Sequence, residues 1–312
     1  MRVFVTGARG QLGRDLTDAL ANRVPIGGLA GDPRTGSMGN RDPVDVVATD
    51  LPELDITDRA AVLDALAAAR PDVVVHGAAF TAVDACESEP DRAFAVNALA
   101  TRHLVEAAGR CGAHLVYVST DYVFGGTARR PYVEWDRPDP VSVYGRSKYG
   151  GELETRPSDT VVRTSWVCGA HGANMMKTVL RLAAGDGPLR FVDDQHGCPT
   201  FTADLAGALA ELAVSRRPGT FHVTNQGATT WFAFAQAVLR ASGHDPGRVL
   251  AVRTADLDPP RPAPRPANSV LDNAALRLSG LPLLPPWGDA LGRLVEALGK
   301  MPPAEVGDAS SR

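Results

Sequence analysis

Tyr144 and Lys148 are the residues whose types and spacing most directly suggest chemistry in this chain. On a helix, a spacing of four places both side chains on one face. A free phenol has a pKa of about 10, and a neighbouring ammonium group favours the phenolate and brings the tyrosine towards the range of an acid-base catalyst. The pair predicts proton donation to a carbonyl oxygen as a hydride reaches the carbonyl carbon.

Chance alone often supplies Y-x-x-x-K, so the pair needs support from other residues. A second polar group that precedes it in the sequence provides this support. Thr120 and Asp121 follow an expected strand at residues 113–119. Open α/β sheets bind their ligands at the carboxyl ends of such strands. Thr120 could therefore hydrogen-bond the same carbonyl or the tyrosine hydroxyl.

Three glycines form G-x-x-G-x-x-G directly after the first expected strand and across the start of a helix near Gln11. Gly7 permits a tight turn, Gly10 lets the backbone approach a pyrophosphate, and Gly13 lets the helix pack closely on the sheet. A diphosphate is then stabilised by the positive end of the helix. This context predicts a dinucleotide site.

An acidic residue, Asp50, ends the second expected strand, where it can accept hydrogen bonds from the adenosine ribose hydroxyls. A carboxylate there would repel a 2′-phosphate, and the next two residues offer no cation, so NADH is favoured over NADPH. Two observations leave the preference open: Arg34 and Arg41 could fold over this end of the site, and Asp50 could be an ordinary solvated carboxylate.

Strand-length apolar runs alternate with segments of helical periodicity, which predicts a Rossmann-type, doubly wound parallel sheet with helices on both faces. The expected strands cover residues 2–6, 44–49, 72–76, 113–119, 160–166 and 221–223. The first expected helix begins near residue 11, and the others cover 57–70, 90–110, 203–213 and 231–241. The helix at 90–110 carries the apolar residues Phe94, Leu99, Leu104 and Val105.

Two domains are expected from the point at which this alternation weakens. Residues 1–166 form the NAD(P)-binding domain, with segments near 200–225 returning to it, and 167–300 form a smaller, discontinuous substrate-binding domain. The stretch 27–43 is expected to be a surface loop, the proline-rich stretch 258–266 an extended loop, and 301–312 a flexible tail.

Composition excludes several classes of protein. The 312 residues carry 44% hydrophobic and 22% charged residues and a net charge of −4, which provides no basic field for nucleic acid. Without a signal peptide or an apolar run of about 18 residues, we expect a cytoplasmic protein that does not bind membranes. Four scattered cysteines predict reduced thiols and no metal site, and motifs of metalloproteases, serine hydrolases and P-loop enzymes are absent.

Longer motifs make residues 1 to about 278 resemble the dTDP-4-dehydrorhamnose reductases, within the extended short-chain dehydrogenase/reductase superfamily. The matching pieces are Val5 to Gly7 with Gly10 to Gly13, Leu54 to Thr57, Ala78 to Asp84, Ser119 to Phe124, Tyr144 to Lys148, Arg163 to Val167, Asp194 to Thr200, and Arg265 to Ser269. The resemblance implies that NADH or NADPH reduces the 4-keto group of a dTDP-4-dehydro-6-deoxy-L-hexose.

The resemblance also implies roles for individual residues. Tyr144 would donate the proton, Lys148 would hold the nicotinamide ribose and tune Tyr144, Thr120 and Asp121 would contact the sugar, and Trp166 would pack on the substrate. The residues implied to line the cofactor, together with the tyrosine, the lysine and the glycine turn, are Gln11, Leu12, Asp50, Asp55, Ile56, Ala79, Phe80 and Thr81.

Several alternatives remain at this point. The product could be dTDP-L-rhamnose or an antibiotic sugar related to dihydrostreptose, because Gly125 and His76-Gly77 depart from the usual family residues. An epimerase or dehydratase shares the fold, although Tyr122 stands where dehydratases carry Glu after Thr-Asp. A non-catalytic regulatory subunit is a third reading. Some relatives bind Mg²⁺ at a dimer interface, but no pattern assigns a metal here, and the chain could be a monomer or a homodimer.

Overall fold

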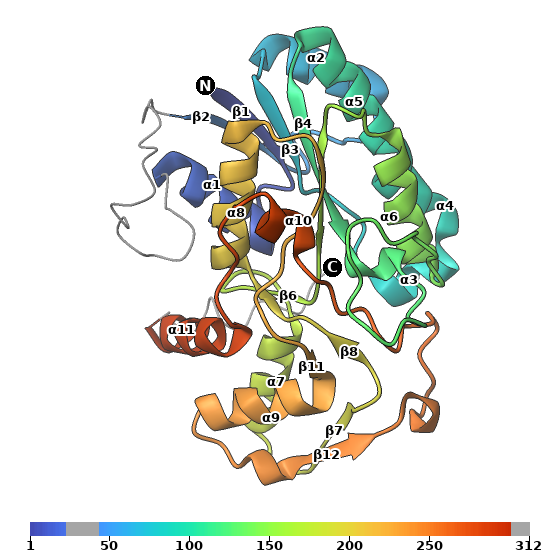
Figure 1. The fold of residues 1–312 in the computed structure, drawn as a ribbon, viewed down its shortest axis with the longest axis vertical. Coiled ribbons are helices and arrows are strands. Elements are labelled where there is room, and N and C mark those ends of the chain that lie inside the picture. Colours follow the sequence, from blue (N-terminus) through green and yellow to red (C-terminus); the bar gives the residue numbers. More distant parts are fainter. Residues whose placement is uncertain (23–43, 301–312) are drawn as a thin grey trace.

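A six-stranded sheet forms the centre of the protein (Figure 1). The computed structural model describes residues 1–22 and 44–300, so the expected loop at 27–43 and tail at 301–312 lie outside the described residues. The strands are β1 (Arg2–Thr6), β2 (Asp45–Thr49), β3 (Val73–His76), β4 (His114–Thr120), β5 (Thr160–Thr164) and β10 (Gly219–His222).

The strands run in the order β2-β1-β3-β4-β5-β10, and every neighbouring pair is parallel. The predicted doubly wound fold is therefore confirmed. In β3, Val73, Val74 and Val75 are all fully buried. This is the pattern of a central parallel strand, because crossover helices cover both of its faces.

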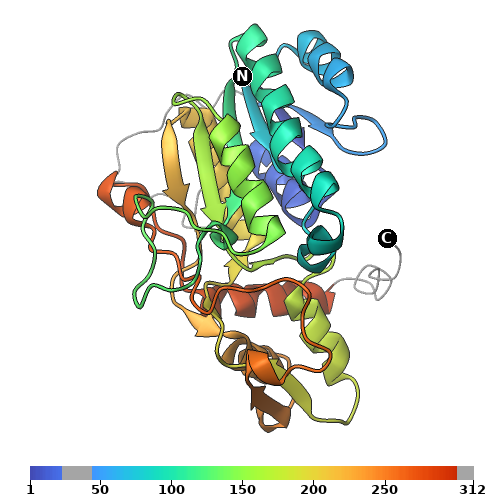
Figure 2. The same cartoon turned by 90° about the vertical axis from the view of Figure 1, so that its right-hand side faces the viewer.

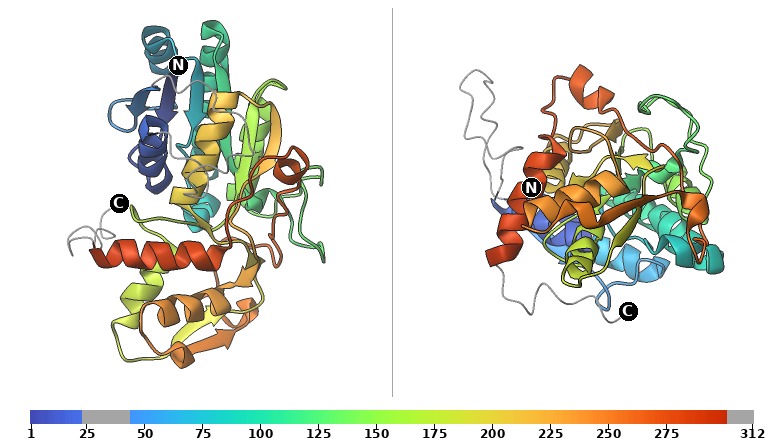
Figure 3. Two further views of the ribbon diagram at one scale, coloured as in Figure 1. Left: turned by 60° about the vertical axis from the view of Figure 1, so that its left-hand side comes forward. Right: turned by 90° about the horizontal axis from the view of Figure 1, so that it is seen from below.

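Helices cover the sheet in two layers (Figures 2 and 3). On one face α1 (Gln11–Asn22) packs against α8 (Thr202–Ser215), and their apolar residues share a core with β1 and β3. On the other face lie α2 (Arg59–Ala69), α5 (Ala100–Cys111) and α6 (Val143–Glu154). The shorter helices are α3 (Val83–Ser88), α4 (Pro90–Phe94), α10 (Ala274–Leu278), and the 3₁₀ turns η3 (Asp121–Val123), η4 (Pro246–Arg248) and η5 (Thr254–Asp256).

The helix expected over 90–110 is interrupted by a π-helical turn, η2 (Ala95–Leu99), between α4 and α5. Of the apolar residues of this segment, Phe94 and Leu99 have side chains that are 42% and 44% exposed, whereas Leu104, beyond the turn, is fully buried. A π turn changes the helical phase, so a face read at 3.6 residues per turn does not continue through it.

A smaller layer lies below the carboxyl ends of the sheet in Figure 1. It consists of β6 (Val167–Cys168), α7 (Met175–Ala183), β7 (Leu189–Val192), β8 (His196–Gly197), β9 (Thr200–Phe201), β11 (Thr229–Thr230), α9 (Trp231–Ala241), β12 (Val249–Val252) and α11 (Trp287–Lys300). Helices α7, α9 and α11 share a separate core. An ion pair between Arg293 and Asp204 (2.6 Å) joins α11 to α8 of the sheet.

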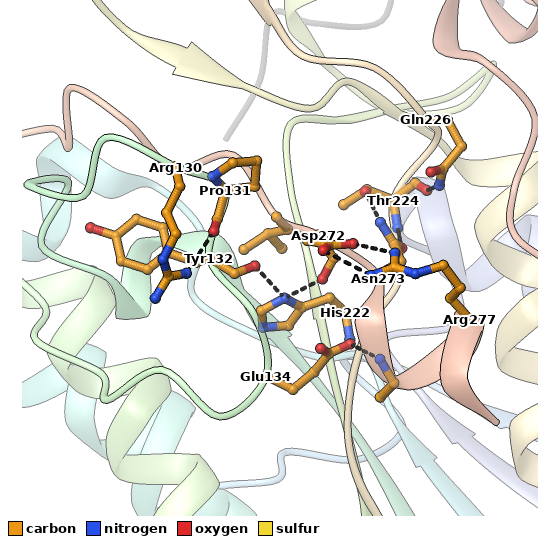
Figure 4. A network of polar contacts seen from close by, with 12 residues as sticks. Arg130, Pro131, Tyr132, Glu134, His222, Thr224, Gln226, Asp272, Asn273 and Arg277 are labelled. Atoms are coloured by element: carbon orange, nitrogen blue, oxygen red, sulfur yellow. Dashed lines mark hydrogen bonds and ion pairs between the residues drawn. The ribbon is translucent and has the colours of Figure 1, made fainter.

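Two loops are joined at the end of β10 (Figure 4). The Nδ1 atom of His222 lies 3.2 and 3.0 Å from the carbonyl oxygens of Tyr132 and Asp272. The Glu134 carboxylate accepts hydrogen bonds from the backbone N–H groups of His222 (2.9 Å) and Ala275 (3.0 Å). Burial lowers the pKa of His222 to about 3, so the neutral imidazole links the two loops at physiological pH.

The four cysteines are free, and no helix within 1–22 and 44–300 is long and apolar enough to cross a membrane. The proline-rich stretch 258–266 contains no helix or strand, as expected. His76 is fully buried, whereas His114 is only partly so and bonds Thr160 through its ring.

A buried ion pair holds α6 on the sheet. The Arg163 guanidinium on β5 donates two hydrogen bonds to the Glu152 carboxylate, at 2.9 and 2.7 Å, and Ser119 donates a third at 2.6 Å. The two charged side chains are only 5% and 7% exposed. Each charge therefore depends on the other for its stability in the interior.

We predict that Arg163→Leu lowers the free energy of unfolding by about 3–5 kcal/mol, because it leaves the Glu152 carboxylate buried and unpaired. Urea unfolding followed by circular dichroism measures the change. The matched control is Arg102→Leu, which removes the surface pair with Glu154 and should leave the midpoint unchanged. Equal effects of the two substitutions would contradict the prediction.

Candidate functional site

A cleft of about 740 Å³ opens at the carboxyl ends of the parallel strands. It is lined by the last residues of β1, β2, β4 and β5, and by Gly77 just after β3. It includes the point between β1 and β3 where the strand order reverses, which is the usual ligand position in doubly wound sheets. The predicted site residues that line it are Gly7, Gly10, Gln11, Leu12, Gly13, Asp50, Asp55, Ile56, Ala79, Thr81, Thr120, Asp121, Tyr144, Lys148 and Trp166.

The glycine turn has the geometry of a pyrophosphate cradle. Gly7 has a positive φ of 71°, and a Cβ there would lie 2.7 Å from the backbone nitrogen of Ala78. A Cβ at Gly13 would overlap with the carbonyl oxygen of Gly7, so this glycine permits close packing of the helix on the turn itself rather than on the sheet. The amino terminus of α1 faces the cleft, as anion binding requires. These residues fit a dinucleotide cofactor.

Asp50 lines the cleft beside this turn. Its carboxylate accepts hydrogen bonds from the backbone N–H groups of Arg9 and Leu51, both at 2.8 Å. The Arg9 guanidinium, which sequence reasoning overlooked, donates to the carbonyl oxygen of Leu51 (2.7 Å) and pairs with Glu53. A cation therefore does lie beside Asp50, but a carboxylate already neutralises it.

Phe80 is not brought to the cleft with its neighbours. Its ring lies under the guanidinium of Arg92, 4.5 Å from Cζ to centroid. Its backbone N–H and carbonyl both bond the Asn97 side chain, at 2.8 and 3.1 Å.

Asp55, another residue predicted to bind the cofactor, does line the cleft. Hydrogen bonds from the side chain and backbone of Thr57 lower the pKa of its carboxyl group.

The first turn of α6 carries Tyr144 into the cleft. Ser142 caps this helix by accepting a hydrogen bond from the backbone of Gly145 (3.1 Å). A Cβ at Gly145 would overlap with the carbonyl oxygen of Tyr122, so only glycine lets α6 approach the η3 turn this closely. Burial raises the pKa of Tyr144 above its usual value, against a smaller lowering effect of the neighbouring Thr120 side chain, so the phenol keeps its proton at neutral pH.

Lys148, one turn further along α6, is buried, with 2% of its surface exposed. Its Nζ lies 4.2 Å from the centroid of the Tyr117 ring, a cation–π contact. Burial lowers the pKa of Lys148 to about 7, against a smaller raising effect of Glu152. His76 also lies nearby, and burial together with the Lys148 charge lowers its pKa to about 3, so it stays neutral.

Asp121 is also buried, next to Thr120. Its carboxylate accepts hydrogen bonds from Thr120 (3.0 Å) and Ser165 (2.9 Å), and Ser269 bonds it as well. Burial raises the pKa of Asp121 to about 6 despite these bonds. The carboxyl group is thus positioned to orient Thr120 and is within reach of a ligand in the cleft.

Aromatic residues from two parts of the chain form the opposite wall. Trp166 has a positive φ of 47°, and its ring stacks on Trp231 with centroids 3.5 Å apart. The strand expected to reach Trp166 ends at Thr164 for this reason. Sequence reasoning missed Trp231, Met175 and the direct exposure of Tyr122 to the cleft. Of these three residues, only Tyr122 could have been predicted from the sequence to line the cleft, because it directly follows Thr120-Asp121.

The arrangement can hold a dinucleotide along the glycine turn and present a protonated phenol to a carbonyl at the other end of the cleft. A buried ammonium and a threonine hydroxyl accompany that phenol, as acid-base catalysis of hydride transfer requires. Within the described part of the chain, no cluster of three or more His, Cys, Asp or Glu side chains could hold a metal ion.

The chain is similar to several known proteins along almost its whole length. Residues 1–300 match the family model described as RmlD substrate binding domain. The chain is 45% identical over 307 residues to the dTDP-4-dehydrorhamnose reductase of Streptomyces griseus, covering 95% of this chain and 94% of the relative. It is 42% identical to a probable dTDP-4,6-dihydroxy-2-methyloxan-3-one 4-ketoreductase of Streptomyces antibioticus, covering 93% of each chain. A crystal structure of the Bacillus anthracis dTDP-4-dehydrorhamnose reductase in complex with NADP superposes with a TM-score of 0.84 at 35% identity, covering 95% of this chain and 99% of that one.

The pKa of Lys148 yields a pH prediction. Because burial depresses this pKa, the lysine is charged below about pH 7 and neutral above it. If Tyr144 donates its proton as the sequence predicts, the Lys148 charge would stabilise the phenolate that is left, so kcat/KM for carbonyl reduction should fall about tenfold per pH unit above pH 7. Lys148→Arg, which stays charged, should remove this fall even if its rate is lower. A profile that is flat to pH 9 in the unsubstituted enzyme would contradict the assignment.

Proposed function

The chain belongs to the RmlD family of dTDP-4-dehydrorhamnose reductases, and from this premise we propose that its cleft reduces the 4-keto group of a dTDP-4-dehydro-6-deoxy-L-hexose. It is an NAD(P)H-dependent oxidoreductase. The observation that carries the proposal is the meeting of Tyr144, Lys148 and Thr120 in one cleft with the dinucleotide turn.

The reaction divides between the cofactor and the side chains. When bound, the reduced nicotinamide supplies the hydride to C4 of the sugar. Tyr144 donates its proton to the 4-keto oxygen. The Thr120 hydroxyl has one proton, which it donates to Asp121 in this structure, so it must turn that proton towards the same oxygen or the phenol to hydrogen-bond either of them. Lys148 binds the nicotinamide ribose and stabilises the phenolate, and Asp121 orients Thr120. Trp166 packs on the substrate, with Trp231 supporting it from behind.

The chain's other parts follow from this assignment. Residues 1–166, with β10 and the segment near 200–225, form the cofactor-binding domain, and 167–300 provide the substrate side. Because all four cysteines are free, we place the enzyme in the reducing cytoplasm, as a monomer or homodimer. We propose that it binds the dTDP-sugar as its substrate and that it binds neither nucleic acid nor membranes.

Reduction, rather than epimerisation or dehydration, is supported by the residue after Thr120-Asp121. Tyr122 stands there, so the extra acid that elimination of water needs is missing from that position. A non-catalytic regulatory role is disfavoured because Thr120, Tyr144 and Lys148 are all present. The sugar can be the rhamnose precursor or that of a related antibiotic sugar, because a dTDP-4-dehydrorhamnose reductase and a probable dTDP-4,6-dihydroxy-2-methyloxan-3-one 4-ketoreductase are similar to this chain to about the same degree, at 45% and 42% identity.

We predict stoichiometric oxidation of NAD(P)H when the enzyme is mixed with a dTDP-4-dehydro-6-deoxy-L-hexose, followed by absorbance at 340 nm. Tyr144→Phe should lower kcat by at least about 100-fold and leave the Kd for the cofactor unchanged, because only the transferable proton is lost. Turnover of the sugar without net oxidation of the cofactor would instead indicate an epimerase or dehydratase. Unchanged activity in Tyr144→Phe would remove the tyrosine from the mechanism.

For the cofactor we propose a preference for NADH. The Asp50 carboxylate lines the cleft after β2, where it would repel a 2′-phosphate, and Glu53 pairs with Arg9, a cation beside it in the described part of the chain. Asp50 still has lone pairs for the ribose hydroxyls, since its two bonds come from backbone N–H groups.

The preference is tested by kcat/KM for both cofactors. Asp50→Ser should lower the ratio for NADH over NADPH by about tenfold or more, because the like-charge repulsion is removed. Glu53→Gln should shift the ratio in the same direction by freeing Arg9. An enzyme that favours NADPH before any substitution would overturn the preference while leaving the proposed reaction intact.

A further inference from the structure

A proline-rich strap, residues 261–269, runs between the two parts of the molecule beside the catalytic turn. Its Ala263 N–H donates to the Asp84 carboxylate on α3 (3.1 Å). At its other end, Ala267 accepts from the backbone N–H of His196, and Ser269 donates to the carbonyl of His196, both at 2.8 Å. The strap is therefore fixed at α3 and at β8 of the substrate side.

One strap residue makes a two-point bond to α3. The Arg265 guanidinium donates to both oxygens of Asp84, at 2.9 and 2.8 Å, and to the carbonyl of Ala263 at 2.8 Å. Its side chain is only 15% exposed. Two parallel bonds from a planar guanidinium fix its orientation as well as its position.

The same guanidinium reaches the catalytic turn. It lies beside the Tyr122 hydroxyl, with which it interacts electrostatically, and the Tyr122 ring packs edge-on against the Tyr144 ring with centroids 5.8 Å apart. Both rings line the cleft. A continuous path of contacts thus runs from Asp84 through Arg265 and Tyr122 to the proton donor. A second strap residue, Ser269, bonds Asp121 on the same turn.

We propose that Arg265 is a positioning residue for the reduction, which holds Tyr122 against Tyr144 and so fixes the direction of the phenolic hydroxyl. The inference rests on the proposed role of Tyr144 as the proton donor. Tyr144 lies in the first turn of α6, so packing of its ring restricts its rotation more than the helix does. Proton donation requires about 2.6–3.2 Å between the phenolic oxygen and its acceptor, and a displacement of about 1 Å can cost 100-fold in rate.

A double-mutant cycle tests this path. Arg265→Ala and Tyr122→Phe should each lower kcat by about 10- to 100-fold with little change in the KM of the sugar. The double variant should be no slower than the slower single variant, because both substitutions break the same link. Arg265→Lys keeps the charge but cannot bond Asp84 at two points and lie beside Tyr122 at the same time, so it should restore only part of kcat.

The control is Arg261→Ala, since Arg261 also contacts Asp84 (3.6 Å) but is 56% exposed. It should leave kcat unchanged. The Kd for NAD(P)H and the Tm are measured for every variant, and if Arg265→Ala does not fold, the cycle is run with Arg265→Lys. Multiplicative rate losses in the double variant, or an effect on KM alone, would overturn the inference. If the unsubstituted enzyme does not oxidise NAD(P)H with the 4-keto sugar, the proposed function itself fails instead.

Discussion

The burial of the Lys148 ammonium group is the constraint on which most of the site depends. A buried cation is costly unless its surroundings compensate for the lost water. Here Glu152, one turn further along α6, is already committed to Arg163 and Ser119, so it compensates Lys148 only in part. The Tyr117 ring supplies a negative face, and His76 stays neutral. The lysine is thereby held close to losing its proton near neutral pH.

The same burial explains why α6 must lie so close to the sheet. Tyr144 can act on a ligand at the strand ends only if the first turn of α6 contacts the turn that carries Thr120. Gly145 allows that approach, Ser142 begins the helix there, and the Glu152–Arg163 pair fixes its far end. Chemistry and stability are therefore coupled through one helix that is fixed at both ends.

The sequence predicted the parallel sheet and most of the cleft, because those features follow from local patterns. Apolar runs define buried strands, three glycines define the turn, and Y-x-x-x-K defines one helical face. Contacts between distant segments leave no such pattern in the sequence. The residues around Trp231 do not predict that it stacks on Trp166, and those around Arg265 do not predict that it lies beside Tyr122. Phe80 lies outside the cleft although its neighbours Ala79 and Thr81 line it, and no sequence pattern shows that a π turn at Ala95–Leu99 interrupts the helix.

The missing side chain at Gly145 also bears on how such enzymes can diverge. Because backbone packing, rather than a replaceable side-chain contact, sets the approach of α6 to the η3 turn, substitutions on the substrate side of the cleft leave the backbone of Tyr144 in place. The wall formed by Trp166, Trp231 and Met175 comes from different segments and can vary independently. New sugars can then be accepted by changes on the substrate side while the inherited chemistry continues, so divergence of specificity need not pass through an inactive ancestor.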